Sequence, residues 1–392
     1  MTARLIPRPE CLERYGKQDS GRKPAEWRLS VNLHTLSQTQ YHTADKLGVS
    51  VVICSHNGEK LLPATLAHLK NQDVNGDLKW EVLVIDNAST DQTALVARHC
   101  WGEDGPAPMR VIFEPRLGLS YARERAFKEA QYELVSFVDD DNWVTPKWVM
   151  TVSERMSADC ELGAIGSVNT AVADVPFPEW FSRYCHYYAA WAYRESATLS
   201  SWILNGAGMS IRKSTWQKLR QDGFRLCLTG RLGARLSSSE DLEIGCAIQL
   251  GGWKIGLERR LQLEHYMSPK RLEWRYLRKL LRAVGESRVV LDSYFLVSQS
   301  RRPSLMNHLR QCWWVRLVRE SLHLFYHYSV PKIVLSLFRD MEGDEEVAEI
   351  ELRIGRLLGL LRIRSRYRQL RREIALASWR RLDSLDVTTV NA

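Results

Sequence analysis

Short apolar runs alternate with helical patterns between Val49 and Val138, and this alternation constrains the fold more than any other feature of the sequence. The runs are rich in β-branched residues and predict four strands, at Val49–Ile53, Trp80–Ile85, Met109–Phe113 and Leu134–Val138. Helical patterns near residues 59–71, 90–100 and 120–130 separate them. Strand–helix–strand units of this kind predict a parallel sheet covered by helices, so the expected fold class is α/β.

The same pattern divides the 392 residues into three regions. Residues 1–48 show no clear periodicity and are expected to form an N-terminal extension. Residues 49–268 hold the α/β domain, and residues 269–392 are expected to form a helical C-terminal region. A chain of this length with 45% apolar residues can bury more than one core. A disulfide-stapled miniprotein and a chain that is disordered throughout are therefore excluded.

Charge and cysteine content indicate the compartment and the partners. The eight cysteines form no CxxC pair, which is typical of reduced thiols in the cytoplasm. No window of about 18 uncharged apolar residues predicts a spanning helix, and the first ten residues lack the apolar core of a signal peptide. The net charge is +9, but the excess lies in one terminal segment without a nucleic-acid-binding motif. We therefore expect a cytoplasmic protein without a nucleic-acid partner.

The basic excess is concentrated in residues 352–381. Apolar residues recur there at helical spacing with arginines on the other faces; they are Leu357, Leu358, Leu361, Tyr367, Leu370, Ile374 and Ala377. Two interpretations stay open. Such an amphipathic tail can lie on an anionic membrane surface, as a peripheral contact on the inner face of the membrane. Alternatively, it can pack on the core with its arginines solvated or paired with the acidic residues of 340–351.

An acidic triplet, Asp139, Asp140 and Asp141, directly follows the fourth predicted strand. Ligands of open α/β sheets bind at the carboxyl ends of the strands, and adjacent carboxylates repel one another unless a cation lies between them. Their oxygens suit Mg²⁺ or Mn²⁺ that also holds substrate phosphates. At the end of the second strand, Asp86 can accept hydrogen bonds from a ribose or a base, and His56 after the first strand can stack on a base.

Six segments, spread in a fixed order over roughly residues 49–266, carry a resemblance to a known family. They are VVICSHN (51–57), VIDNASTD (84–91), GLSYAR (118–123), FVDDD (137–141), NGAGMSIR (205–212) and SEDLE (239–243). Together they resemble the inverting glycosyltransferases of family 2. The resemblance implies a GT-A fold, in which a mostly parallel central sheet flanked by helices binds a nucleotide-diphospho-sugar. The segment at 51–57 departs from the family pattern at His56, where tyrosine is more usual.

The resemblance also implies roles for individual residues. The donor site would contain Ser55, His56, Asn57, Asp86, Arg123, Asp139 and Asp140. The Mn²⁺ or Mg²⁺ ion would be held by Asp139, Asp141 and His265. The acceptor side would contain Asn205, Gly206 and Gly208. The general base would be Asp241, with Glu240 beside it as the residue that can raise its pKa by like charge.

The function implied is the metal-dependent transfer of a sugar, with inversion, from a nucleotide-diphosphate donor. UDP is the favoured nucleotide, and the acceptor is a hydroxyl on a glycan or a lipid-linked intermediate. Such a reaction needs one carboxylate to take the hydroxyl proton and a cation to neutralise the leaving diphosphate. The alternative is a catalytically inactive protein of the same fold that binds nucleotide sugars or acts as a scaffold.

Several of these residues also have structural interpretations. Glu240 and Asp241 suit the first turn of a helix, and Asp91 suits a turn that caps the helix after it. A lone histidine such as His265 can equally be structural. The aromatic residues between 180 and 191 are expected mainly to pack in the core, with an acceptor platform as the alternative. The apolar segment Leu322–Tyr328 is expected to pack in the core or in an interface.

Overall fold

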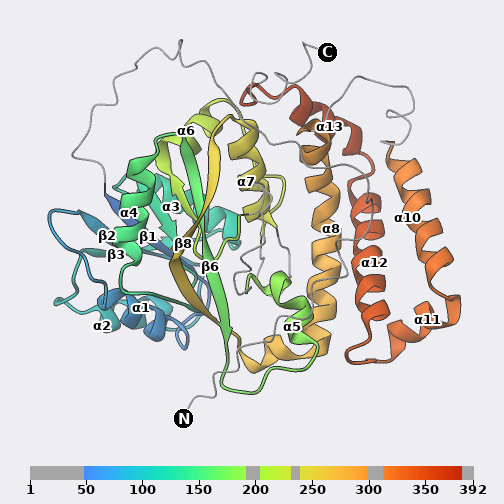
Figure 1. The fold of residues 1–392 in the computed structure, drawn as a ribbon, viewed down its shortest axis with the longest axis horizontal. Helices are drawn as coiled ribbons and strands as arrows, with labels where there is room; N and C mark the ends of the chain where they lie inside the picture. The colour runs from blue at the N-terminus through green and yellow to red at the C-terminus, as the bar shows by residue number, and fades with distance from the viewer. Residues whose placement is uncertain (1–47, 191–203, 231–238, 299–311, 382–392) are drawn as a thin grey trace, which may run out of the picture.

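The computed structural model of the chain describes residues 48–190, 204–230, 239–298 and 312–381 (Figure 1). The molecule is built on an eight-stranded sheet with the order β3-β2-β1-β4-β7-β6-β8-β5. The strands are β1 (Val49–Ser55), β2 (Trp80–Asn87), β3 (Met109–Glu114), β4 (Leu134–Phe137), β5 (Asn142–Val144), β6 (Leu162–Val172), β7 (Ser210–Arg212) and β8 (Lys254–Tyr266). The N-terminal extension predicted for residues 1–48 lies almost wholly outside the described residues.

The half of the sheet formed by β3, β2, β1 and β4 is parallel, as the alternating pattern predicts. Strands β6 and β8 are also parallel, whereas β7 pairs antiparallel with β4 and β6, and β5 pairs antiparallel with β8. The expected α/β class is confirmed, with a mixed sheet. All four predicted strands are present, and β1 and β2 run two residues farther because Ser55 still pairs with Asp86.

Helices cover both faces of the parallel half. One face packs against α3 (Leu119–Glu129), α6 (Lys213–Gln221) and α7 (Glu240–Leu250), and the other against α1 (Leu62–Lys70), α2 (Thr93–Trp101) and α4 (Trp148–Ala158). Strand β1 shows why both faces are apolar. Val52 enters the first core, while Val51 and Ile53 enter the second, because successive strand residues point to opposite faces.

Helix α2 begins three residues later than the predicted 90–100 helix. The carboxylate of Asp91 accepts hydrogen bonds from the backbone N–H of Thr93 at 3.0 Å and of Glu59 at 3.2 Å. These bonds hold Asp91 in a turn ahead of the helix, which agrees with its structural interpretation as a capping residue.

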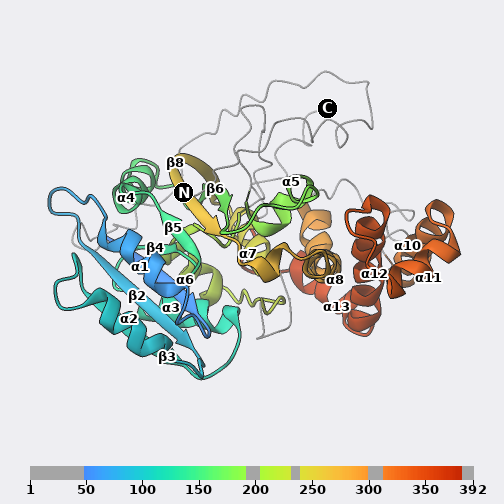
Figure 2. The same cartoon turned by 90° about the horizontal axis from the view of Figure 1, so that it is seen from below.

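The helical C-terminal region is confirmed, and its helices form layers beside the sheet (Figures 1 and 2). The elements here are η4 (Pro269–Leu272), α8 (Trp274–Ser298), α10 (Trp313–His327), α11 (Val330–Phe338), α12 (Glu345–Ile363) and α13 (Tyr367–Ala375). Two glycines let α8 and α12 approach closely. A Cβ on Gly285 would lie 2.1 Å from the Leu352 carbonyl oxygen, and one on Gly355 would lie 2.1 Å from that of Arg282. Figure 2 shows α10 and α11 beyond α12, on the side away from the sheet.

The basic tail of residues 352–381 packs on the molecule. It is split between α12 and α13, and Tyr367, Leu370 and Ile374 of its apolar stripe are buried. Its arginines pair with acidic residues of α8 and α10; the pairs are Arg356–Asp292, Arg353–Glu320 and Arg362–Glu286. The structure therefore favours packing over membrane docking for this segment, although the acidic partners lie mostly in α8 and α10 and not in residues 340–351. No helix within the described residues is long and apolar enough to cross a membrane.

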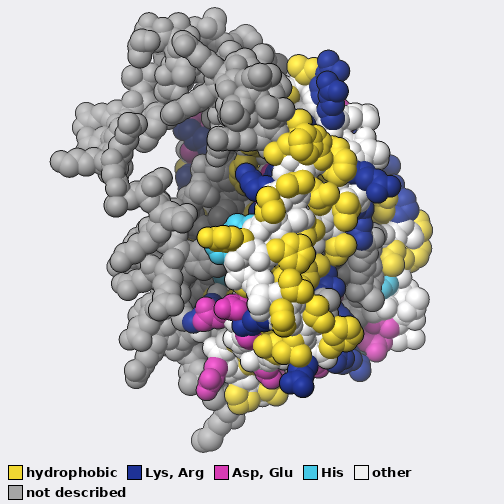
Figure 3. Space-filling model, turned by 90° about the vertical axis from the view of Figure 1, so that its right-hand side faces the viewer, with side chains coloured by type: hydrophobic (Ala, Val, Ile, Leu, Met, Phe, Trp, Pro, Cys, Tyr) yellow, Lys and Arg dark blue, Asp and Glu magenta, His cyan; other side chains and the backbone are white. Residues whose placement is uncertain are grey.

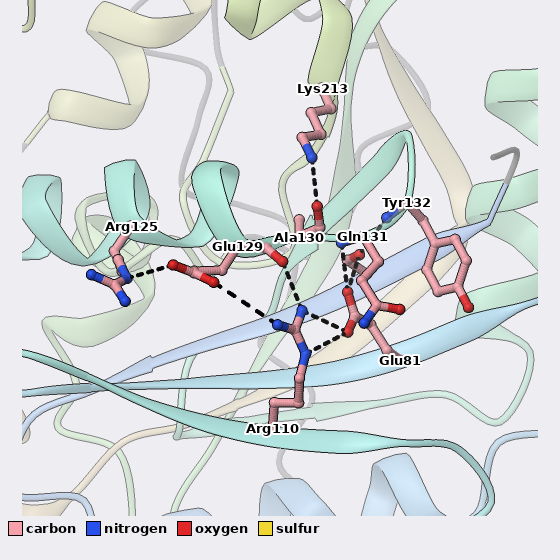
Figure 4. A network of polar contacts seen from close by, with 9 residues as sticks. Glu81, Arg110, Arg125, Glu129, Ala130, Gln131, Tyr132 and Lys213 are labelled. Carbon is pink, nitrogen blue, oxygen red and sulfur yellow. Dashed lines mark hydrogen bonds and ion pairs between the residues drawn. The ribbon is translucent and has the colours of Figure 1, made fainter.

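A buried glutamate ties together the amino-terminal ends of the parallel strands (Figure 4). Glu81 of β2 is 1% exposed and accepts hydrogen bonds from the Ser50 hydroxyl and the Gln131 backbone N–H, both at 2.8 Å. The guanidinium of Arg110 donates to its other oxygen at 2.9 and 3.1 Å, and also to the Glu129 carbonyl at 2.7 Å. One carboxylate thus connects β1, β2, β3 and the end of α3, at the opposite edge from the site described below.

Replacing this glutamate tests its contribution to stability. We expect Glu81→Ala to lower the free energy of unfolding by about 3 kcal/mol, because it leaves the buried Ser50 hydroxyl and Gln131 N–H without an acceptor. Urea denaturation of the purified variant measures the change. Glu129→Ala is the control, since Glu129 is a quarter exposed and its ion pairs should contribute less than about 1 kcal/mol. Equal losses in the two variants would show that burial of Glu81 has no special role.

Candidate active site

A cavity of about 290 Å³ lies at the carboxyl ends of β1, β2 and β4. It is also lined by the first residues of α7, by Gly206 and Ala207 of the loop before β7, and by His265 near the end of β8. These segments are far apart in the sequence and meet here because the parallel strands all end at this edge. Of the acids that follow the predicted strands, Asp139, Asp140 and Asp141 line this cavity and Asp86 does not.

The loops after β1 and β2 present different residues to the cavity. Ser55 and His56 line it, and the ring Nδ1 of His56 lies 2.8 Å from the Asn87 carbonyl oxygen. Asn57 has a φ of 56° and is bonded to the next loop: its side-chain oxygen accepts from the Thr90 backbone N–H at 2.8 Å. Asn57 is not among the residues that line the cavity.

Asp86 also lies outside the cavity lining. Its Oδ1 accepts a hydrogen bond from the Ser89 backbone N–H at 3.1 Å, and the side chain is buried. The neighbouring Asn87 lines the cavity instead, and its amide is held by the Gly118 N–H at 2.8 Å and the Arg116 carbonyl at 2.7 Å. Asn87 was not predicted from the sequence. The signals for it are its place at the same strand end, next to Asp86, and its position within the segment VIDNASTD (84–91).

All three residues of the acidic triplet line the cavity, and the side chains of Asp140 and Asp141 contact different partners. Asp140 Oδ2 accepts a hydrogen bond from the Ser55 hydroxyl at 2.5 Å, which joins the ends of β1 and β4. Asp141 Oδ2 lies 2.6 Å from Arg271 Nη1, and its Oδ1 lies 3.3 Å from His265 Nε2. Asn142 donates to the same Oδ1 at 3.0 Å. The structure therefore brings Asp141 and His265 together, 124 residues apart in the sequence.

The Asp141–His265 pair fits a divalent cation such as Mn²⁺ or Mg²⁺. Adjacent ligands of an octahedral ion with bonds of about 2.1 Å lie about 3 Å apart, close to the 3.3 Å observed here. The Nδ1 of His265 is buried and has no hydrogen-bond partner among the residues that the structure describes. Within the described residues, no group of three or more His, Cys, Asp or Glu is placed to hold a metal. An ion here would therefore take its other ligands from substrate phosphates and water.

Arg271 supplies positive charge at the same position. Its Nη1 lies 2.6 Å from Asp141 and 3.2 Å from His265 Nε2, and its side chain is largely buried. In the structure this guanidinium neutralises Asp141, and it lies within the cavity where a leaving diphosphate could also meet it.

Arg123 of α3 forms a buried ion pair with Glu240 at the start of α7. The two side chains are 3% and 6% exposed, and Arg123 Nη1 lies 2.8 Å from Glu240 Oε1. Burial alone would lower the pKa of Arg123, but the carboxylates of Glu240, Asp139 and Asp241 outweigh burial and raise it. The guanidinium is thus a permanent charge in the cavity wall, and it counterbalances the charge of Glu240 that was expected to act on Asp241.

Asp241 is held by backbone hydrogen bonds. Its Oδ2 accepts from the Gly206 N–H at 2.6 Å, and its Oδ1 accepts from the Leu242 N–H at 2.9 Å. Gly206 has no room for a side chain, because a Cβ there would lie 2.3 Å from Arg123 Nη2. The segment before Asp241 is also constrained, since Ser239 has a φ of 75°. The carboxylate therefore has a fixed orientation at the cavity.

The predicted acceptor-side residues are placed differently from one another. Gly206 lines the cavity, whereas Asn205 and Gly208 do not appear in its lining. Gly208 has a φ of 78°, and its N–H donates to the Phe137 carbonyl at 3.1 Å. A Cβ at Gly208 would lie 2.0 Å from Ser167 Oγ, so this glycine is required to fold the loop against β4 and β6.

The aromatic group near residue 180 is mostly core, as expected. Trp180, Phe181 and Tyr184 are buried against α8 and each other. Tyr187 and Tyr188 of η3 (Cys185–Tyr188) line the cavity as well, together with Leu280 of α8. This wall is the part of the cavity that fits the acceptor-platform alternative, while Trp191 lies outside the described residues.

Cys54 at the end of β1 also lines the cavity. Burial raises the pKa of its thiol to about 12, despite the opposing effect of Arg123. The thiol is therefore neutral at pH 7 and is a poor nucleophile. Among the residues that line the cavity, the groups that can take a proton from a substrate are the carboxylates and the imidazoles of His56 and His265.

Comparison with known proteins identifies related sequences. The family described as glycosyl transferase family 2 matches residues 50–216. The chondroitin synthase of Escherichia coli is 28% identical over 131 residues, which cover 30% of this chain and 17% of that protein. The undecaprenyl-phosphate 4-deoxy-4-formamido-L-arabinose transferase of Pseudomonas aeruginosa (strain LESB58) is 27% identical over 135 residues, which cover 34% of this chain and 39% of that protein. The matches thus span less than half the length of these relatives.

Among solved structures, a similar one is the mannosyltransferase PcManGT from Pyrobaculum calidifontis in complex with GDP-Man and Mn²⁺. It is 18% identical in sequence, with a TM-score of 0.49 over 80% of this chain and 86% of that chain.

The Arg123–Glu240 pair generates a prediction for stability. We expect Glu240→Ala to lower the free energy of unfolding by about 3–5 kcal/mol, because the guanidinium of Arg123 loses its closest counterion while it stays buried. Urea denaturation followed by circular dichroism measures this loss. The control is Glu161→Ala, which breaks the ion pair with Lys254 on the surface and should cost less than about 1 kcal/mol. A Glu240→Ala variant as stable as this control would contradict the assigned role of the pair.

Proposed function

This chain carries a domain of glycosyl transferase family 2 in residues 50–216, and on that premise we propose that it transfers a sugar, with inversion, from a nucleotide-diphosphate donor to a hydroxyl acceptor. One observation carries the proposal: Asp241, on α7, and the acidic strand end at Asp139–Asp141 line the same cavity from segments about a hundred residues apart. Asp241 provides a positioned carboxylate, and Asp139–Asp141 provide the carboxylates that would face a cation bound to the donor phosphates.

The donor half of the proposed site lies along β1 and β4. The exposed ring of His56 is available to a base, with its Nδ1 beside the Asn87 carbonyl, and UDP remains the favoured nucleotide. We assign Asp140 to the sugar or the ribose, and Asp139 to the donor and the cation. Asp141 and His265 would hold a Mn²⁺ or Mg²⁺ ion, which neutralises charge on the diphosphate when it is bound. Arg271 adds a second positive group beside them.

The acceptor half lies toward α7 and η3. We assign Asp241 as the general base, because Gly206 and Leu242 fix its carboxylate by backbone hydrogen bonds at the cavity. The acceptor O–H gives its proton to Asp241 as its oxygen forms a bond to the sugar's anomeric carbon, and the bond from that carbon to the diphosphate breaks. The relative that acts on undecaprenyl phosphate and the relative that makes chondroitin support a lipid-linked or glycan acceptor.

Replacing the base separates catalysis from donor binding. We expect Asp241→Asn to lower the turnover of sugar transfer by at least about 100-fold, because the amide cannot accept the hydroxyl proton. The affinity for UDP, measured by isothermal titration calorimetry, should stay within about twofold. Asp340→Asn, at an exposed position between α11 and α12, is the matched control. Unchanged turnover in Asp241→Asn would remove Asp241 as the base.

Assays of sugar transfer and donor hydrolysis on the same proteins distinguish an enzyme from the scaffold alternative. A wild-type chain that binds a nucleotide sugar but neither transfers nor hydrolyses it would be a binding protein of the same fold. Loss of hydrolysis and transfer together in Asp241→Asn would instead support the enzyme.

Metal dependence is tested through binding. We expect Mn²⁺ to tighten UDP binding by wild-type protein, and Asp141→Asn to remove most of that gain, because one of the two proposed protein ligands loses its charge. Calorimetry with Mn²⁺ and with EDTA measures the difference without relying on turnover. Asp174→Asn is the control, since the Asp174 carboxylate is exposed and accepts a hydrogen bond from Tyr266. An identical Mn²⁺ effect in both variants would contradict the proposed metal site.

A further inference from the structure

Helices α10 and α11 expose a large apolar face. They carry nine of the sixteen large hydrophobic side chains that are exposed within the described residues, which is far more than their share of the chain. These side chains are Trp314, Val318, Leu322, Phe325, Tyr326, Val330, Val334, Leu335 and Phe338, and together they define the α10–α11 face. Figure 3 shows hydrophobic side chains in a continuous band over this side of the molecule. Of the two expectations for Leu322–Tyr328, packing in the core is wrong for Leu322, Phe325 and Tyr326, and packing in an interface stays a prediction.

Helix α10 buries charged residues beside apolar ones on its inner side and exposes apolar residues on its outer side, unlike the usual surface helix. Its charged residues Arg316 and Glu320 are buried on the inner side, 6% and 5% exposed. Arg316 pairs with Asp292 and donates to the Tyr367 hydroxyl at 2.8 Å, and Glu320 lies 3.2 Å from both Arg353 and Arg356. The ion pairs fix α10 to α8, α12 and α13 while its apolar side faces outward. The position of the α10–α11 face is therefore fixed by buried contacts, and we expect a partner to cover its exposed apolar side chains.

The charge of this face favours lipid over a second copy of the chain. Between Cys312 and Arg339 the sequence has one acidic residue, Glu320, and it is buried. Arg319, 63% exposed, and Arg339 are the exposed cations in that stretch. Two copies packed face to face would bury arginines against one another without acidic partners from these helices. Anionic headgroups supply that charge, and acyl chains cover the apolar side chains.

We propose that the α10–α11 face lies on the surface of an anionic lipid bilayer, with both helices parallel to the membrane plane. Trp314 and Tyr326 suit the boundary between headgroups and acyl chains. This membrane contact differs from the one considered for residues 352–381, because the apolar residues of that tail are largely occupied in packing. It goes beyond the proposed sugar transfer and does not depend on it.

Vesicle binding by the full chain tests the proposal. We expect the protein to co-float with vesicles made of equal parts phosphatidylglycerol and phosphatidylcholine, and much less with phosphatidylcholine alone. Leu322→Glu/Phe325→Glu should lower the partition coefficient by about 100-fold, because both side chains lose their place among acyl chains. Arg319→Gln/Arg339→Gln should lower it by about tenfold on anionic vesicles only.

The control is Leu95→Glu/Phe113→Glu. These residues are 63% and 57% exposed, against 65% and 58% for Leu322 and Phe325, and lie on α2 and β3. Circular dichroism melting checks that all variants fold. Wild-type protein that binds neither vesicle, or a face variant that binds as well as the control, overturns the proposal. Light scattering provides a further test, because it measures the oligomeric state. A wild-type dimer that dissociates in Leu322→Glu/Phe325→Glu but not in the control would also overturn the proposal, since the face would then join two copies of the chain.

Discussion

The buried Arg123–Glu240 pair is the interaction on which the site depends. Two opposite charges that are almost fully removed from water must stay together, because either one alone would be strongly destabilising. Their residues lie 117 positions apart, so the pair fixes the start of α7 against α3 and against the strand ends. The position of Asp241 follows from that placement, and the close approach of Arg123 leaves room only for glycine at position 206. One ion pair thus connects four of the predicted site residues, Arg123, Glu240, Asp241 and Gly206.

Much of the fold could be predicted because its signals are local. Runs of β-branched residues mark β1 to β4, and the acids that follow them must meet at one edge when the strands are parallel. The approach of Asp141 to His265 is different, since it depends on the antiparallel pairing of Asn142 in β5 with His265 in β8. No local pattern encodes that pairing, and only the resemblance to a family indicated it. The contact of Arg271 with both residues likewise has no local signal in the sequence.

Two features could not be predicted from the sequence. One is the direction in which side chains point at the strand ends, and the other is what covers the apolar face of a helix. Asp86 and Asn87 are adjacent, yet only Asn87 lines the cavity, because successive residues of a strand point to opposite sides. Periodicity likewise showed an apolar stripe in residues 352–381 and an apolar segment at Leu322–Tyr328 without showing what covers either one. Tyr367, Leu370 and Ile374 of the first are covered by the protein itself, although its Leu358 and Leu361 are exposed, and three residues of the second are exposed. An amphipathic pattern specifies a face and leaves its partner undetermined.

The site and the α10–α11 face belong to one connected set of helices. Leu280 of α8 lines the cavity, and one and a half turns later Gly285 lies against the α12 backbone. Helix α12 in turn holds α10 through Arg353 and Arg356, which both pair with Glu320. Close backbone contact and buried ion pairs resist sliding, because both lose their favourable geometry after small displacements. The face therefore keeps a fixed orientation relative to the cavity, and whatever surface it contacts also orients the mouth of the site.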